Sequence, residues 1–135
     1  MTGTVTWVGL DVHARSTHAA AIDVLTGELT RARFGAGHEA AVAWLAGLRS
    51  PVRAVYEAGP TGFGLYRAAR DAGVAIEVVA PGKTARPPGD RVKTDRNDAE
   101  LLARLAMAGQ LRAVAVPDAF IEAARHLTRA RARPR

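Results

Sequence analysis

The first third of the chain alternates apolar runs with polar turns, as antiparallel strands do. Residues 5–12 (VTWVGLDV) are β-branched and apolar and run into polar residues, which is typical of a strand in the middle of a sheet. A second apolar run, a Thr26-Gly27 turn and an alternating segment from Glu28 to Phe34 follow, and together they predict a hairpin. Three antiparallel strands are therefore expected to open the domain.

Beyond Phe34 the pattern changes to helices and strands in turn. Apolar residues at helical spacing predict a helix over residues 39–48, and short apolar runs predict strands at 52–57 and 74–79. The segment LYRAARDAG between these strands predicts a helix that ends at Gly73, with Thr61 as its N-terminal cap. Because the order is strand, helix, strand, these later strands should pair in parallel.

The last part of the chain is a loop followed by helices. Residues 81–94 hold three Pro and two Gly without apolar periodicity, which predicts a loop. Apolar residues recur at helical spacing from Asp95 to Gly109, and a final helix should start after Asp118. We expect an α/β domain over residues 1–117, with a mixed five-stranded sheet flanked by helices, and the start of a helical connector with a basic tail over 118–135.

Composition narrows the partners and the compartment. The formal charge of the chain is +6, and its last 16 residues hold five Arg against one Glu, so the excess is concentrated in the tail. This excess favours an acidic partner. Cysteine is absent, which excludes disulfides and thiolate sites. Since no apolar run approaches the roughly 18 residues of a membrane span, we expect a soluble, cytoplasmic protein with no membrane partner.

Two acids stand at the ends of predicted strands. Asp11 closes the first strand and Glu57 closes the strand at 52–57. If these strands run parallel, their carboxyl ends meet at one edge of the sheet and the two acids become neighbours. Taken singly, Asp11 is better explained as a residue that caps the following turn, and Glu57 as a solvated residue at a strand end.

Two further acids stand in the segment RVKTDRNDAEL. Asp95 and Asp98 are three residues apart on the first turn of a predicted helix, so their Cβ atoms should lie about 5–6 Å apart on one face. Acids at a helix N-terminus also interact favourably with the helix dipole, which is the alternative interpretation of this pair.

Together the four acids indicate a metal site. Carboxylates crowded at one place repel one another unless hard divalent cations neutralise them, and Mg²⁺, with Mn²⁺ as a substitute, prefers such oxygen ligands. Two such ions can activate a water or hydroxyl and stabilise the leaving oxygen in phosphodiester cleavage. The surrounding cations would hold a phosphate backbone beside the acids. These cations are Lys83, Arg86, Arg91, Lys93 and Arg96. His13 and His18 flank the first turn, but we do not expect them to be ligands, since Mg²⁺ favours oxygen.

Three motifs, in order and spacing, resemble a known family. GLDVH, YEAGPTG and RPPGDRVKTDRNDAELLARL are similar to motifs in the N-terminal catalytic domain of the DEDD transposases of bacterial insertion sequences, which also resemble pilin-gene invertases. The resemblance covers residues 6 to about 128. It implies a RuvC-like RNase H fold and DNA recombination, with the family's acids falling on Asp11, Glu57, Asp95 and Asp98. It also implies a guide RNA partner and a place at the bacterial nucleoid.

The resemblance also leads us to expect a second domain that this sequence does not include. The family continues through a coiled-coil helix into a second domain with a serine nucleophile, whereas this sequence stops at HLTRARARPR. We therefore expect a truncated catalytic domain and leave open whether it turns over by itself. The apolar stripe on the helix after residue 118 suggests homo-oligomers or attachment to the second domain. Its members are Phe120, Ile121, Ala124 and Leu127.

Two other functions stay open at this point. A non-catalytic nucleic-acid-binding remnant would keep the four acids without turnover, and sequence does not separate it from the enzyme. An ATP-binding domain of the sugar-kinase and actin type also begins with an Asp at the end of its first strand. That domain requires Gly-rich phosphate turns after the Asp, and the segment VHARST offers none.

Overall fold

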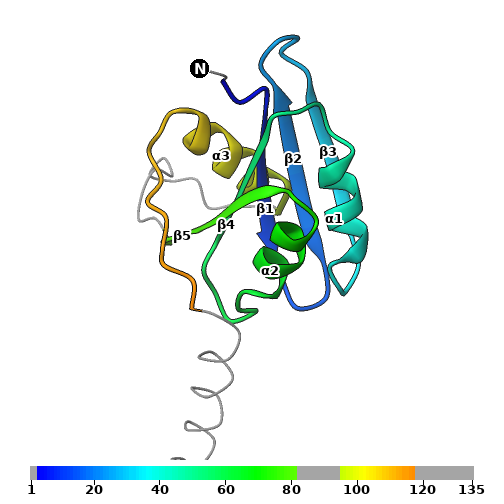
Figure 1. Ribbon diagram of the computed structural model, residues 1–135, viewed down its shortest axis with the longest axis vertical. Helices are drawn as coiled ribbons and strands as arrows, with labels where there is room; N and C mark the ends of the chain where they lie inside the picture. Colours follow the sequence, from blue (N-terminus) through cyan, green and yellow to red (C-terminus); the bar gives the residue numbers. More distant parts are fainter. Residues whose placement is uncertain (1–2, 82–94, 118–135) are drawn as a thin grey trace, which may run out of the picture.

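The protein is built around one mixed β-sheet (Figure 1). The computed structural model describes residues 3–81 and 95–117, with side chains in the second range from Asp98 onward. The strands are β1 (Thr6–Val12), β2 (Thr17–Asp23), β3 (Leu29–Phe34), β4 (Val52–Glu57) and β5 (Ala75–Val79), and they lie in the order β3-β2-β1-β4-β5. β1, β2 and β3 pair antiparallel, whereas β4 runs parallel to β1 and β5 parallel to β4. The expected α/β RNase H-like sheet is confirmed.

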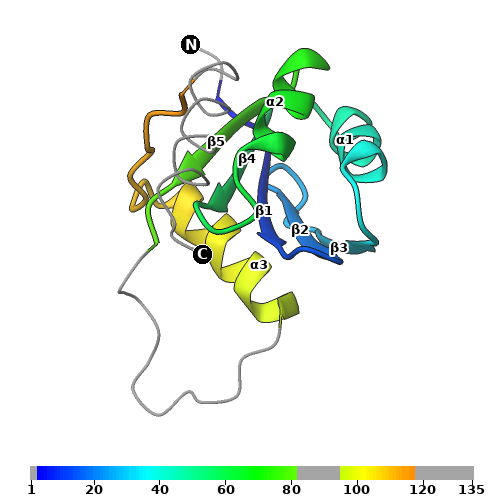
Figure 2. The same cartoon turned by 90° about the horizontal axis from the view of Figure 1, so that it is seen from below.

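Helices cover both faces of this sheet (Figure 2). They are α1 (Glu39–Ala46), α2 (Gly64–Asp71) and α3 (Asp95–Met107). α1 and α2 pack on one face and α3 crosses the other. The prediction that Thr61 caps α2 is wrong, because α2 begins later, with Phe63 at its N-cap position and no side-chain cap.

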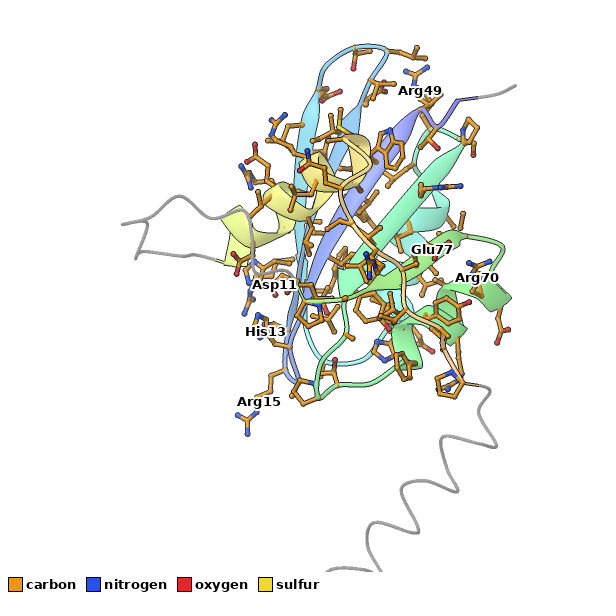
Figure 3. All side chains as sticks on the ribbon, turned by 90° about the vertical axis from the view of Figure 1, so that its left-hand side faces the viewer. Asp11, His13, Arg15, Arg49, Arg70 and Glu77 are labelled. Carbon is orange, nitrogen blue, oxygen red and sulfur yellow. The ribbon has the colours of Figure 1, made fainter. Side chains whose placement is uncertain are left out.

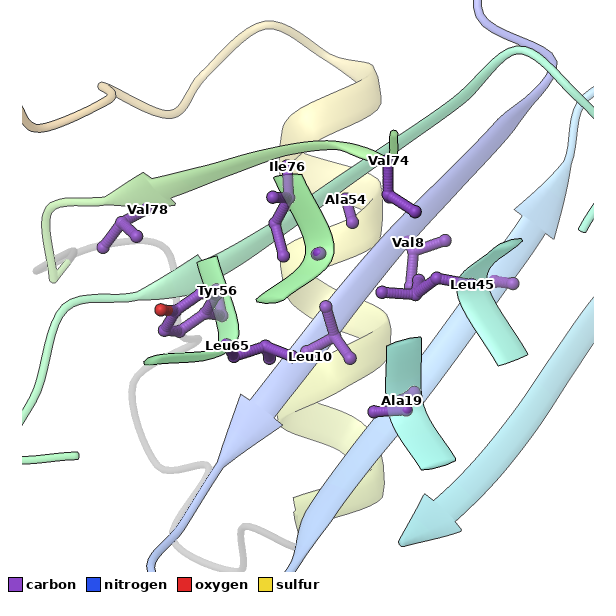
Figure 4. Packing of buried hydrophobic residues seen from close by; sticks show 13 residues of the cluster. Val8, Leu10, Ala19, Leu45, Ala54, Tyr56, Leu65, Val74, Ile76 and Val78 are labelled. Atoms are coloured by element: carbon purple, nitrogen blue, oxygen red, sulfur yellow. The ribbon is translucent and has the colours of Figure 1, made fainter. Parts of the chain in front are cut away.

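The main core fills the space between the sheet and the pair α1 and α2 (Figure 4). Successive strand residues point to opposite faces, so every second residue of each strand enters this core. Those from β1 and β4 are Val8, Leu10, Ala54 and Tyr56, and they meet Leu45 of α1 and Leu65 of α2. Gly9 lies between Val8 and Leu10, Asp11 follows Leu10 and Glu57 follows Tyr56, so these three residues belong to the face that α3 covers.

α3 lies close against the central strand at Gly9. A Cβ placed on Gly9 would come within 2.6 Å of the backbone nitrogen of Ala103 and 2.8 Å of the Leu102 Cβ. Only glycine leaves room for a helix backbone at this distance from a strand. Small residues on the helix match it, since Ala99 and Ala103 are fully buried. Further along, Ala106 and Trp7 line the same cavity, so α3 runs antiparallel to β1.

Candidate functional site

Asp11 and Glu57 lie side by side at the carboxyl end of two parallel strands. Leu10 of β1 is in register with Tyr56 of β4, and each acid follows by one residue. Because Leu10 and Tyr56 point into the core beneath α1 and α2, both acids belong to the α3 side. Neighbouring strands are about 4.8 Å apart, so the backbones that carry these carboxylates are adjacent. The sequence prediction that the two acids become neighbours agrees with this register.

The end of β4 is held by Tyr56. Its buried hydroxyl donates to the carbonyl of Gly62 and accepts from the N–H of Tyr66, both at 3.2 Å. The N–H of Ala58 donates to the carbonyl of Val79 at 2.9 Å, which continues the β4–β5 pairing past Glu57. The backbone at Glu57 is thus fixed on both sides.

The first turn of α3 lies toward the same end of the sheet. Ala99 and Ala103 sit over Gly9 and Ala106 lies beside Trp7, so the helix residues before Ala99 extend in the direction of Asp11. Asp98 is partly buried and directly precedes the fully buried Ala99. Asp95 is the first residue of the helix, and its side chain lies outside the described part of the structure.

The described acids share an end of the sheet without forming a closed cluster. Across residues 3–81 and the described side chains of α3, no group of three or more His, Asp or Glu side chains is arranged to hold a metal ion. The topology thus brings Asp11, Glu57 and the start of α3 to one region. The metal-site assignment of the four acids stays a prediction.

His13 contacts Asp11 directly (Figure 3). Its Nε2 lies 3.0 Å from Oδ2 of Asp11, with the histidine side chain 48% exposed and the carboxylate 19% exposed. His18 lies opposite Asp11 in the β1–β2 pairing, on the same face. The sequence analysis did not predict this contact, although residues i and i+2 of an extended chain point to one side and the spacing of Asp11 and His13 is compatible with it.

Besides the contact between His13 and Asp11, a set of charged residues joins α3 to the edge strand β3. Glu100 Oε1 accepts from Arg31 Nη2 of β3 at 2.5 Å, and Oε2 accepts from Arg104 Nε at 2.9 Å. The hydrogen bond from Arg104 is the largest cause of the lowered pKa of Glu100; partial burial opposes it and Arg31 adds to it. Sequence reasoning missed this contact, since 69 residues separate Arg31 from Glu100.

Most of the predicted phosphate-binding cations lie outside the described residues. These are Lys83, Arg86, Arg91 and Lys93, and the side chain of Arg96 in α3 is likewise not described. Among the helices that the structure does describe, none is long and apolar enough to cross a bilayer.

Comparison with known proteins identifies the family. The family model of the IS110-type DEDD transposases, described as "Transposase", matches residues 8–133. The putative transposase y4qE of Sinorhizobium fredii (strain NBRC 101917 / NGR234) is 62% identical over 76 residues, which cover 56% of this chain and 20% of that protein. The transposase for insertion sequence element IS1533 of Leptospira borgpetersenii is 34% identical over 103 residues, covering 73% of this chain and 30% of that protein. The chain thus spans less than a third of these curated relatives, and it belongs to the IS110 family of DEDD transposases.

Proposed function

We propose that this chain is the metal-dependent catalytic domain of a transposase and acts on DNA phosphodiesters through Asp11, Glu57, Asp95 and Asp98. The observation that carries the proposal is the register of β1 with β4, which sets Asp11 beside Glu57 on the face that α3 crosses. Because α3 runs antiparallel to β1 on this face, its first turn, which carries Asp95 and Asp98, extends toward the same end of the sheet. Family membership supplies the DNA substrate class.

The donor set fits a hard divalent cation. All four residues offer carboxylate oxygens, which Mg²⁺ and Mn²⁺ prefer over softer ligands. When bound, such ions lower the pKa of a water or hydroxyl and neutralise charge on the phosphate. The chain's own contribution is rigidity, since Asp11 lies on the central strand and the backbone beside Glu57 is held by Tyr56.

Metal binding by the purified chain tests the proposal. Titration with Mn²⁺, followed by electron paramagnetic resonance, should show binding that Asp11→Asn and Asp98→Asn each abolish while circular dichroism stays unchanged. Asp71→Asn, at the exposed end of α2, is the matched control and should bind like the unmodified chain. Equal Mn²⁺ affinity in all three variants would refute the metal assignment.

We further propose that the basic segment before α3 holds the DNA backbone. The proposal is supported by the sequence position of Lys83, Arg86, Arg91, Lys93 and Arg96 directly before and at the start of the helix that carries Asp98. Replacing Arg91 and Lys93 with Ala should weaken binding to a DNA duplex at every sequence tested. The slope of log affinity against log salt should flatten by about one for each phosphate that the variant no longer neutralises. An unchanged slope would place the DNA elsewhere.

The remaining features are proposed from the family resemblance and, for association of copies, from the apolar stripe after residue 118. They are a guide RNA partner, action at the bacterial nucleoid in the cytoplasm, and a helical connector over residues 118–135 through which copies associate. Sedimentation equilibrium with Ile121→Glu tests the last of these, since a charge in an apolar stripe should shift dimers to monomers. Complete recombination is proposed to need the serine-bearing domain that the family resemblance implies.

The nucleic-acid-binding remnant is the second candidate. It is kept because a remnant would retain the same four acids as the enzyme, and the sequence does not separate the two. A remnant would bind DNA equally well with and without Mn²⁺, and would do so after Asp11→Asn. A catalytic domain would instead convert a labelled duplex to shorter products only with Mn²⁺ and only with Asp11 intact.

A further inference from the structure

We propose that Glu100 is a positioning residue, which sets the rotation of α3 on the sheet and thereby the place of the Asp98 carboxylate. The inference rests on the proposed function, because Asp98 matters only if it joins Asp11 and Glu57. It assigns a role to the contact between Glu100 of α3 and Arg31 of the edge strand β3, neither of which belongs to the four acids.

The contact at Gly9 sets how close α3 lies but gives little control over its rotation. At this crossing the helix meets a residue without a side chain through Ala99, Ala103 and the Cβ of Leu102. Small, smooth surfaces of this kind allow close approach, whereas interlocking side chains are what define the rotation of one element on another. Leu102 makes such a contact on the β4–β5 side of Gly9, where it packs with Val55 and Val79. A second point of attachment, on the β2–β3 side, is needed to hold the helix against rotation about the first.

The bond between Arg31 and Glu100 provides that second point. Gly9 pairs with Ala20 in β2, and Ala20 pairs with Arg31 in β3. Arg31 therefore stands two strands away from Gly9, roughly 10 Å to the side, at the same level along the sheet. Its guanidinium reaches Glu100 Oε1 at 2.5 Å, with side chains only 29% and 24% exposed. Charge-assisted bonds of this kind are among the stronger ones.

The rotation matters because Asp98 is two residues before Glu100 on the same helix. Side chains extend about 5–6 Å from a helix axis, so a rotation of about 20° moves a carboxylate by about 2 Å. Catalytic and metal-binding constellations tolerate only about 0.5 Å. Loss of the lateral bond would thus disturb Asp98 without unfolding the domain.

Arg104 also binds Glu100, but its role differs from that of Arg31. It contacts the other carboxylate oxygen of Glu100, with Nη2 at 2.8 Å and Nε at 2.9 Å. Both residues belong to α3, four positions apart, so this pair orients the Glu100 side chain but does not attach the helix to the sheet. Arg31 and Arg104 thus share one partner, and only Arg31 provides the cross-link.

The test compares variants of these arginines in the full chain. Mn²⁺ affinity should fall about tenfold in Arg31→Met and in Glu100→Gln, a loss typical of residues that orient metal ligands. Arg31→Lys, which keeps the charge, should recover part of it, and Arg104→Met should reduce the affinity less than Arg31→Met does. Arg49→Met is the control. It removes the 3.0 Å contact with Asp23, which lies at the end of β2 away from Asp11, and should leave Mn²⁺ affinity unchanged.

Hydrogen exchange without metal keeps this inference separate from the proposed function. In Arg31→Met the amides of α3 should exchange faster than in Arg104→Met, while the slowest amides of β1 keep their rates. If the unmodified chain binds no Mn²⁺, the metal proposal fails, and the exchange comparison still decides whether Arg31 and Glu100 position α3. Equal exchange in α3 for Arg31→Met and Arg104→Met, or equal acceleration in β1 and α3, would overturn the positioning role.

Discussion

Gly9 of β1 lies directly against Ala99 of α3, and a Cβ on Gly9 would overlap the carbonyl oxygen of Ala99. The overlap is with backbone, which cannot rotate aside as a flexible side chain does. The closeness of α3 to β1 therefore depends on a missing side chain in the middle of the central strand. Through this contact, one residue of β1 sets the height at which the acid-bearing turn of α3 stands over the strand that carries Asp11.

Gly9→Ala should destabilise the domain. The added methyl forces α3 away from β1, and overpacking of this kind costs about 1–3 kcal/mol or more. Urea unfolding followed by tryptophan fluorescence measures the loss. Gly35→Ala is the control, because a Cβ there meets nothing within 4 Å and the free energy of unfolding should change by less than about 0.5 kcal/mol. Equal stability of the two variants would show that α3 does not press on Gly9.

Leu10→Ala should have a larger effect from the other face of the same strand. Leu10 is fully buried among the residues under α1 and α2, so its truncation leaves a cavity and should cost about 2–5 kcal/mol. Leu25 is 67% exposed in the β2–β3 turn, and Leu25→Ala should stay within about 0.5 kcal/mol. Thermal unfolding of the two variants tests the assignment of faces, and similar midpoints would contradict it.

Tyr56→Phe isolates the hydroxyl that fixes the end of β4. The change leaves the ring in the core but deprives the Gly62 carbonyl and the Tyr66 N–H of their buried partner, at a cost of about 1–3 kcal/mol. Tyr66→Phe serves as the control, since its ring is only partly buried at the edge of the core. Hydrogen exchange should be faster at the start of α2 in Tyr56→Phe alone, and unchanged protection there would refute the bracing role.

Patterns of neighbouring residues predicted most of this fold because they report local structure and burial. The run VTWVGLDV indicated a central strand, and strand-helix-strand order indicated the parallel pairing that sets Asp11 beside Glu57. The helix starting at Asp95 also followed from apolar spacing. Each strand and helix is a local feature of neighbouring residues, and the pairing of β1 with β4 followed from the order of these elements.

Contacts between distant segments do not follow from such patterns. The residues around Gly9 form an ordinary apolar strand. Nothing in them shows that a helix about 90 residues later will pack on the space left by the missing side chain. Arg31 and Glu100 carry no local sign of their pairing. The prediction that Thr61 caps α2 was wrong because the helix begins only after Phe63, which occupies the N-cap position. In each case the deciding partner is supplied by tertiary packing.

Asp23 should make the stability of the domain depend on acid pH. Partial desolvation raises its pKa, but hydrogen bonds from the N–H groups of Leu25 and Thr26 and the contact with Arg49 together lower it below the ordinary value. A carboxylate whose pKa is lower in the folded state stabilises that state fully above its unfolded pKa of about 3.9. This contribution is lost as the pH falls from about 4 through the folded pKa.

Asp23→Asn should therefore be less stable than the unmodified chain at pH 7, and the difference should shrink as the pH is lowered below about 4. Urea midpoints measured from pH 7 to pH 2.5 give the comparison. Arg49→Met is the companion variant, because it removes the ion pair and keeps both backbone hydrogen bonds to Asp23, so its loss of stability at pH 7 should be the smaller. A difference between Asp23→Asn and the unmodified chain that stays constant across this range would mean that the Asp23 charge contributes nothing and that only its shape matters to the turn.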